Sequence, residues 1–331
     1  MKHLFLTAVA AASLVLPVYA GEPAPIPSPG EIAATAPASD WIAIAPSDLL
    51  VMDLAPDAKG KARRVVIQLM PAPFSQGWIG NIRKLAAAHW WDGTSVNRVQ
   101  DNYVVQWGDA TEKKPLPAGL ATVSESEYVA APSASMLDTL HANRKRKEQV
   151  VKQWRASQPF AIYTPDTRKK VDAYSDIQGF VSGWPIAGGS EIWPVHCYGA
   201  VGVGRNLSPD TGSGAELYTV IGHAPRHLDR NIALIGRVIS GIEHLSSLPR
   251  GTEALGFYKS EAERVPIASI RIASELPAVE QPRFEYLSTE SDSFARYADA
   301  RANRRDPFFI TPAGGADICN IPVPVRPVAA K

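Results

Sequence analysis

Short runs rich in apolar residues, separated by turn residues, predict a protein built mainly of short β-strands. Residues 48–54 (DLLVMDL) and 63–70 (RRVVIQLM) are two such runs, and the Pro, Asp and Gly between them are typical of a hairpin loop. One further strand is expected over 97–109 (NRVQDNYVVQWGD). After a long gap, more runs with β texture follow at 197–206, 215–223, 231–241 and 267–274.

Helical spacing of apolar residues is found in fewer places. The stretch 75–93 begins with a serine that is expected to cap a helix, places Trp78, Ile82 and Leu85 on one face, and ends in Asp-Gly. The other predicted helices lie at 136–154, 241–248 and 291–306.

In this order the elements favour a closed, mainly antiparallel β-barrel covered by two helices. The barrel domain is expected over residues 41–275, with a partly helical insertion at about 111–194, and residues 276–331 form a C-terminal extension. The helix of the insertion carries the basic run RKRK, residues 144–147, which is either a docking surface or a solvated helix face.

The start of the chain has the features of a cleavable secretory signal. Lys2 and His3 precede a short apolar run, and Val18-Tyr19-Ala20 ends in a small residue, so cleavage is expected after Ala20. The protein is therefore expected to be exported to the periplasm. Residues 21–40 are rich in Pro, Ala and Ser and have no apolar period, which indicates a solvated linker.

Composition narrows the classes of partner. The 331 residues are 45% hydrophobic and 20% charged, with a formal net charge of +1. This balance gives no basic footprint for nucleic acid, and after the signal no apolar run is long enough to insert into a membrane. A soluble monomer is expected.

The chain has two cysteines, Cys197 and Cys319. In an oxidising compartment an even pair is expected to form a disulfide. The alternative is two separate buried thiols, because free cysteine is a common core residue.

The run over 97–109 also carries candidate chemistry. Arg98 and Gln106 flank an apolar stretch that includes Tyr103 and Val104. If the run is an ordinary half-buried strand, Arg98 is a surface cation and Tyr103 a core aromatic. If it lines a cleft, the same residues are an apolar floor between two hydrogen-bonding groups.

This run resembles the first cyclophilin signature, in which Phe-His-Arg-Val is followed by a short turn, Phe-Met and Gln-Gly-Gly-Asp. Residues 199–245 resemble the second signature, where a Gly-rich loop, a Gln-Phe-Phe strand and a Leu-Asp turn lead into an apolar strand. The resemblance spans roughly 48–110 and 196–275. It implies an eight-stranded antiparallel barrel capped by two helices, and a peptidyl-prolyl cis-trans isomerase that binds proline-containing polypeptide clients and needs no cofactor.

The resemblance also assigns site residues. Arg98 falls on the catalytic arginine and Gln106 on the glutamine that accompanies it. The positions expected to bind substrate are Tyr103, Val104, Gly204, Arg205, Glu216, Tyr218, His227, Leu228 and Ile232. Four positions depart from the family: Glu216 replaces a glutamine, His227 a tryptophan, Ile232 a histidine, and Asn97 the histidine before the arginine.

The residues themselves fit amide rotation. A fixed cation beside the prolyl nitrogen would stabilise the twisted amide and not the planar ground state. Arg98 supplies that cation, and Gln106 either holds the substrate carbonyl or orients Arg98. Because several rim positions depart from the family, the alternative function is a proline-peptide binding module or chaperone with weak or no isomerase activity.

One possible metal motif remains. His223 and His227 are four residues apart, a spacing that binds zinc on a helix. Pro225 lies between them and no third ligand is near in the sequence, so a loop without metal is expected.

Overall fold

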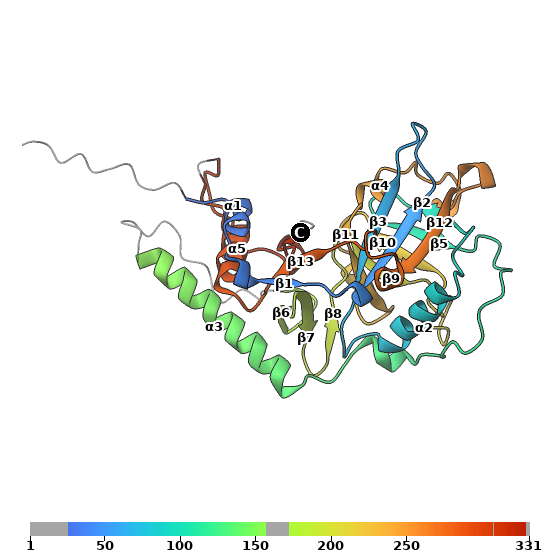
Figure 1. Ribbon diagram of the computed structural model, residues 1–331. Helices are drawn as coiled ribbons and strands as arrows, with labels where there is room; N and C mark the ends of the chain where they lie inside the picture. Colours follow the sequence, from blue (N-terminus) through green and yellow to red (C-terminus); the bar gives the residue numbers. More distant parts are fainter. Residues whose placement is uncertain (1–25, 157–171, 307, 329–331) are drawn as a thin grey trace, which may run out of the picture.

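The computed structural model describes residues 26–156, 172–306 and 308–328. Figure 1 shows an eight-stranded barrel at one end of the molecule and a smaller lobe of helices and short strands at the other. The predicted signal peptide, residues 1–20, lies outside the described residues.

Antiparallel strands close the barrel in the order β10-β5-β4-β12-β2-β3-β11-β9. In chain order they are β2 (Leu49–Leu54), β3 (Arg63–Leu69), β4 (Ser95–Val99), β5 (Val104–Gly108), β9 (Ala200–Val203), β10 (Leu217–Val220), β11 (Leu234–Ser240) and β12 (Val265–Ile272). Apolar side chains such as Leu50, Met52 and Ile67 fill the interior and are fully buried. The predicted fold, a mainly β closed antiparallel barrel, is confirmed.

The run over 97–109 forms two strands, so the prediction of a single strand was wrong. β4 and β5 are joined by a tight turn in which the Gln100 amide donates to the Val104 carbonyl at 2.9 Å. Asn102 has a positive φ of 50°, a conformation that asparagine tolerates better than most residues. The consecutive polar residues Gln100, Asp101 and Asn102 are the sequence signal for this turn.

Helix α2 (Gln76–Ala87) packs its apolar face, including Trp78, Ile82 and Leu85, on the barrel core. The predicted serine cap is absent. Ser75 adopts a left-handed conformation, and its hydroxyl donates to the Leu234 carbonyl at 2.8 Å, which ties the start of the helix to β11. The second barrel helix, α4 (Glu243–Ser246), is shorter than the predicted 241–248.

The smaller part, which we call the appended lobe, is assembled from three distant segments of the chain. A three-stranded sheet pairs β1 (Trp41–Ala43) with β13 (Phe284–Leu287) and β13 with β14 (Val325–Pro327). The insertion adds a second sheet, β6 (Ile177–Val181), β7 (Trp184–Gly188) and β8 (Ile192–Pro194). The helices of the lobe are α1 (Pro29–Ala34), α3 (Ala134–Ala156) and α5 (Asp292–Ala302).

The described part of residues 21–40 is not the solvated linker that its composition suggested. Helix α1 begins with a capping box, in which Ser28 and Glu31 each accept a hydrogen bond from the other's backbone amide. Ile32 and Ala33 pack on a small core that contains Phe294. The segment is therefore an ordered piece of the appended lobe, because it supplies apolar side chains that α5 buries.

The basic run of α3 divides between two environments. Arg144 pairs with Glu148 on the exposed face of the helix, at 3.2 Å. Arg146 pairs with Asp292 of α5 at 3.0 Å. Burial lowers the pKa of Lys147 from its usual value. Part of the run thus packs within the protein, and part is the solvated face that was one of the two interpretations.

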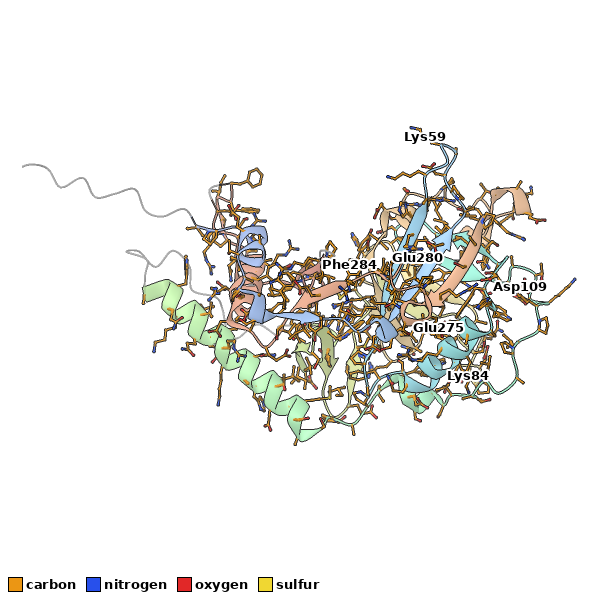
Figure 2. All side chains as sticks on the ribbon, viewed as in Figure 1. Lys59, Lys84, Asp109, Glu275, Glu280 and Phe284 are labelled. Atoms are coloured by element: carbon orange, nitrogen blue, oxygen red, sulfur yellow. A yellow bond between two sulfur atoms is a disulfide. The ribbon has the colours of Figure 1, made fainter. Side chains whose placement is uncertain are left out.

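The barrel and the appended lobe are joined by an apolar cluster and a partly buried cation. Figure 2 shows Phe284 between the two parts, where it packs with Leu49 and Val66 on the outside of the barrel. Arg237 of β11 donates from Nη1 to the Gly183 carbonyl at 2.8 Å and stacks on Trp184. Burial lowers the pKa of Arg237 to about 10, so it keeps its charge at neutral pH.

A disulfide makes the third connection. Cys197, just before β9, is bonded to Cys319 of the C-terminal extension, as the cysteine count predicted. In the described part of the chain no helix has the length and apolarity needed to cross a bilayer.

Removing the disulfide should lower the free energy of unfolding. The crosslink closes a loop over a sequence separation of 122 residues, and the chain-entropy model gives about 4–5 kcal/mol for a loop of that size. We expect Cys319→Ser to lose stability in a urea titration. The double variant Cys197→Ser/Cys319→Ser is the control without a leftover thiol and should match it. A free energy of unfolding equal to that of the natural protein in both variants would contradict the prediction.

Candidate functional site

The register of three strands places the candidate catalytic residues in one row. Arg98 of β4 is directly opposite Gln106 of β5, and Gln106 is directly opposite Tyr218 of β10. Directly paired residues in antiparallel strands point to the same face of the sheet. The three residues, which are far apart in sequence, therefore share one surface of the barrel wall.

The Arg98 guanidinium is fixed by three acceptors. Its Nε donates to the Leu255 carbonyl at 2.8 Å and its Nη1 to Gln106 Oε1 at 3.2 Å, while Nη2 donates to Gln100 Oε1. The cation also lies 5.8 Å from the ring centre of Tyr103. Burial lowers the pKa of Arg98 from its usual value, yet a guanidinium stays charged at neutral pH.

Gln106 links this cation to a carboxylate. Its Oε1 accepts a hydrogen bond from Arg98. Its Nε2 donates to Glu216 Oε2, at a distance of 3.5 Å. The contact with Arg98 fixes which way the carboxamide points. This contact is compatible with the role of orienting Arg98, which is one of the two roles considered for Gln106.

Glu216 lies against the backbone of the neighbouring strand. A Cβ at Gly108 would collide with its carboxylate, so only glycine leaves room for it there. Burial raises the pKa of Glu216 to about 7, although hydrogen bonds from Gln106 and Asn97 act in the opposite direction. Burial therefore favours the protonated form of Glu216 well above the pH at which an exposed glutamate ionises.

Apolar side chains beside Arg98 form the rest of the site. Tyr103, Leu228 and Ile232 are partly buried and pack on the barrel core, and Val104 is fully enclosed at 3% exposure. The exposed His227 ring is nearly parallel to that of Tyr103, with ring centres 6.2 Å apart. Ring contacts join Arg98 to Tyr103 and Tyr103 to His227, and Leu228 follows His227 in the chain.

The loop after β9 is close to Glu216 and Gln106. The Gly204 amide donates to the Glu216 carbonyl at 2.8 Å. The Arg205 guanidinium donates to the Asn231 carbonyl, from Nη2 at 2.7 Å, and to the Asn206 carbonyl from Nη1. Arg205 therefore ties the loop after β9 to the segment before β11 through backbone carbonyls.

Tyr218 is almost as deeply buried as Val104, with 4% of its surface exposed. Its hydroxyl is 2.9 Å from Nε2 of the buried His196. Burial raises the pKa of Tyr218 well above its usual value, so the hydroxyl keeps its proton.

Several residues that shape the site were not predicted from the sequence. Gln100 could have been suspected, because it follows Arg98 by two positions on the same strand edge. Leu255 holds Arg98 with a backbone carbonyl from a distant loop, and a backbone group leaves no signal in the sequence. The partner role of His196 depends on the packing of the insertion against the barrel.

Comparisons with known proteins bear on the family and the fold. The family model described as "Cyclophilin type peptidyl-prolyl cis-trans isomerase/CLD" matches residues 60–274. The crystal structure of cyclophilin AquaCyp293 from Hirschia baltica covers 88% of this chain and 94% of its own, with 21% identity and a TM-score of 0.59, a likeness of fold. A cyclophilin-type peptidyl-prolyl cis-trans isomerase from Cryptosporidium parvum, in the presence of the dipeptide Ala-Pro, covers 67% of this chain and 98% of its own, with 12% identity and a TM-score of 0.34. Curated protein sequences gave no match.

The ionisation of Glu216 should make stability depend on pH. The carboxyl ionises near pH 4.5 in the unfolded chain and near 7 in the folded protein, so folding takes up a proton between these values. The free energy of unfolding should therefore contain a contribution that falls as the pH rises from 4.5 to about 7.

Glu216→Gln removes this contribution. We expect its stability relative to the natural protein to increase between pH 4.5 and about 8 in urea titrations. Glu261→Gln, at an exposed carboxyl, is the control for the loss of one charge. The same stability difference at both pH values would contradict the assignment of Glu216.

Proposed function

Since this chain belongs to the cyclophilin-type peptidyl-prolyl cis-trans isomerase family, we propose that it accelerates the rotation of X-Pro bonds in exported proteins as they fold. Peptidyl-prolyl isomerisation is the activity that the family and the fold support. The class of client is the part that we add. It is supported by the signal-like first twenty residues and by a disulfide that suits an oxidising compartment.

Isomerisation breaks no covalent bond, but the barrier to rotation is high. Rotation about an amide has a barrier of about 18–20 kcal/mol, because resonance must be broken. In the twisted state the prolyl nitrogen becomes pyramidal and carries a lone pair. A hydrogen-bond donor with positive charge, already fixed in position, stabilises this state and gains little from the planar ground state.

The fixed guanidinium of Arg98 is the single observation that carries the proposal. Three of its N–H groups donate to Leu255, Gln106 and Gln100. A guanidinium has five N–H groups, so two remain for a ligand. Because the three contacts hold the plane of the guanidinium, little reorganisation is needed when the substrate amide twists.

The apolar residues beside Arg98 supply the binding half of the function. Tyr103 and Leu228 are partly exposed and apolar, which suits the ring of a proline. A proline ring seated there places its nitrogen near the edge of the site, where Arg98 lies 5.8 Å from the Tyr103 ring centre. Binding energy from the ring is then used to orient the amide toward the cation.

Arg98→Ala should abolish most isomerase activity and leave the barrel folded. Loss of one fixed charge-assisted contact in the transition state should lower kcat/KM by roughly two orders of magnitude or more. The measurement is a protease-coupled assay on the mature protein with short X-Pro peptides, together with thermal melting of each variant.

Two variants serve as controls for this prediction. Arg83→Ala removes a partly exposed arginine from α2 and should leave turnover unchanged. Arg98→Lys keeps the charge without the planar fork and should fall between the natural protein and Arg98→Ala. If Arg98→Ala turned over peptide at the natural rate, the proposed mechanism would be wrong. Tight peptide binding without turnover by the natural protein would favour a binding module instead.

A further inference from the structure

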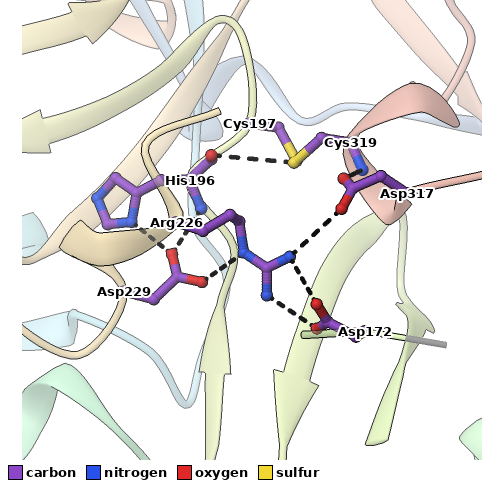
Figure 3. Close-up of a disulfide and its surroundings, with 7 residues drawn as sticks. All are labelled: Asp172, His196, Cys197, Arg226, Asp229, Asp317 and Cys319. Atoms are coloured by element: carbon purple, nitrogen blue, oxygen red, sulfur yellow. Dashed lines mark hydrogen bonds and ion pairs between the residues drawn. A yellow bond between two sulfur atoms is a disulfide. The ribbon is translucent and has the colours of Figure 1, made fainter. Parts of the chain in front are cut away.

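A chain of buried polar groups runs from the isomerase site to the appended lobe. Its members contact one another in sequence, and each is at most 6% exposed: Tyr218, His196, Asp229, Arg226 and Asp172. Figure 3 shows the part of this chain beyond Tyr218, next to the disulfide. Buried polar groups of this kind are costly without partners, so each member depends on the next.

The contacts favour one tautomer of a neutral His196. Asp229 accepts from the His196 backbone amide at 3.0 Å and from Arg226 Nε at 2.7 Å, as an ionised carboxylate does. His196 Nδ1 is 2.9 Å from the same carboxylate and must donate to it. The other ring nitrogen of a neutral imidazole then accepts, so the Tyr218 hydroxyl donates to His196 Nε2 at 2.9 Å.

This hydrogen bond orients the Tyr218 ring. The planes of the two rings differ by 10°, with ring centres 6.4 Å apart. The Tyr218 ring lies over Gly202, where any side chain would collide with it. The ring thus has room only because Gly202 lacks a Cβ, and its polar end is held by His196. Tyr218 is paired with Gln106, so the held ring stands next to the group that orients Arg98.

The far end of the chain is supplied by the appended lobe. Asp172 belongs to the insertion and is not part of a barrel strand. Its carboxylate is 3.0 Å from Arg226 Nη2. Asp317 of the C-terminal extension is 3.9 Å from Arg226 Nη1. The residue after His196 is Cys197, which the disulfide attaches to that extension. The lobe therefore encloses the groups that hold His196.

We propose that His196 is a positioning residue for the isomerase reaction: by accepting from the Tyr218 hydroxyl, it holds the aromatic ring beside Gln106 in the orientation that seats the substrate proline. Asp229 and Arg226 hold His196 in turn, which gives the appended lobe a role at the active site. The inference rests on the isomerase function proposed above and assigns a role to a residue that does not touch the substrate.

Two substitutions of His196 distinguish a role in positioning Tyr218 from a role in the stability of the fold alone. His196→Gln can keep an acceptor near the position of Nε2 but loses the donor to Asp229. His196→Asn can keep the donor near the position of Nδ1 but leaves the Tyr218 hydroxyl without its partner. Both disturb the buried chain, so both should lower the melting temperature. Only the asparagine variant releases the ring.

The expected result is a difference in kcat. In the coupled assay His196→Asn should lose roughly tenfold in kcat with a smaller change in KM, because a misplaced ring misorients the bound amide. His196→Gln should stay within about threefold of the natural kcat, as a conservative rescue of the same contact. Equal losses in the two variants would overturn the proposal and leave His196 a structural residue.

Tyr218→Phe provides the second arm, because it removes the same hydrogen bond from the other side. On this background His196→Asn should change kcat by less than about twofold, since the contact is already absent. Full additivity of the two losses would overturn the proposal. If His196→Asn does not fold, a Tyr218→Phe variant with natural kcat and KM would overturn it as well.

The experiment also separates this inference from the proposed function. Turnover by the natural protein together with equal kcat in the His196 variants means that the positioning role alone is wrong. Absence of turnover in the natural protein means that the isomerase proposal is wrong. The Kd of an X-Pro peptide then decides: weaker binding by His196→Asn than by His196→Gln supports positioning, and equal Kd values contradict it.

Discussion

Arg98 and Gln106 meet because β4 and β5 pair with these two residues opposite each other, and the site depends on this register. The hydrogen bond from Arg98 Nη1 to Gln106 Oε1 at 3.2 Å sets the plane of the guanidinium and the direction of the carboxamide. A shift of one residue would turn both side chains to the other face of the sheet. Closure of the barrel protects the register, because β4 and β5 each have a partner strand on their other side.

The appended lobe is firmly connected to the barrel. Besides the apolar cluster at Phe284, three connections reach it from the segment before β9, from β11 and from the segment before β11: the Cys197–Cys319 disulfide, Arg237 on Trp184, and Arg226 between Asp229 and Asp172. One of these is covalent and the other two are wholly or partly buried, so we expect the lobe and the barrel to unfold together. The third connection continues from Arg226 through Asp229 and His196 to the Tyr218 hydroxyl. The appended lobe is thereby linked to a residue of the candidate site.

The sequence predicted the parts of this structure that local patterns encode. Runs of apolar residues located β2, β3 and much of the barrel core, and the resemblance to the cyclophilin signatures picked out Arg98, Tyr103 and Gln106 as candidate site residues. Contacts between residues far apart in the sequence could not be predicted. Examples are the hydrogen bond from Arg98 to the Leu255 carbonyl and the contact between His196 and the Tyr218 hydroxyl. The linker prediction gave too much weight to Pro and Ala and missed a readable signal, the capping box of Ser28 and Glu31.

The central claim is that the fixed Arg98 cation lowers the barrier to rotation of a bound X-Pro bond. The most direct measurement is NMR exchange spectroscopy of an isotope-labelled X-Pro peptide saturated with the mature protein, which gives the cis–trans rate of the bound peptide itself. Uncatalysed isomerisation takes tens to hundreds of seconds at about 25 °C. The account predicts exchange of the bound peptide in less than about a second. A bound peptide that exchanges at the uncatalysed rate would contradict it.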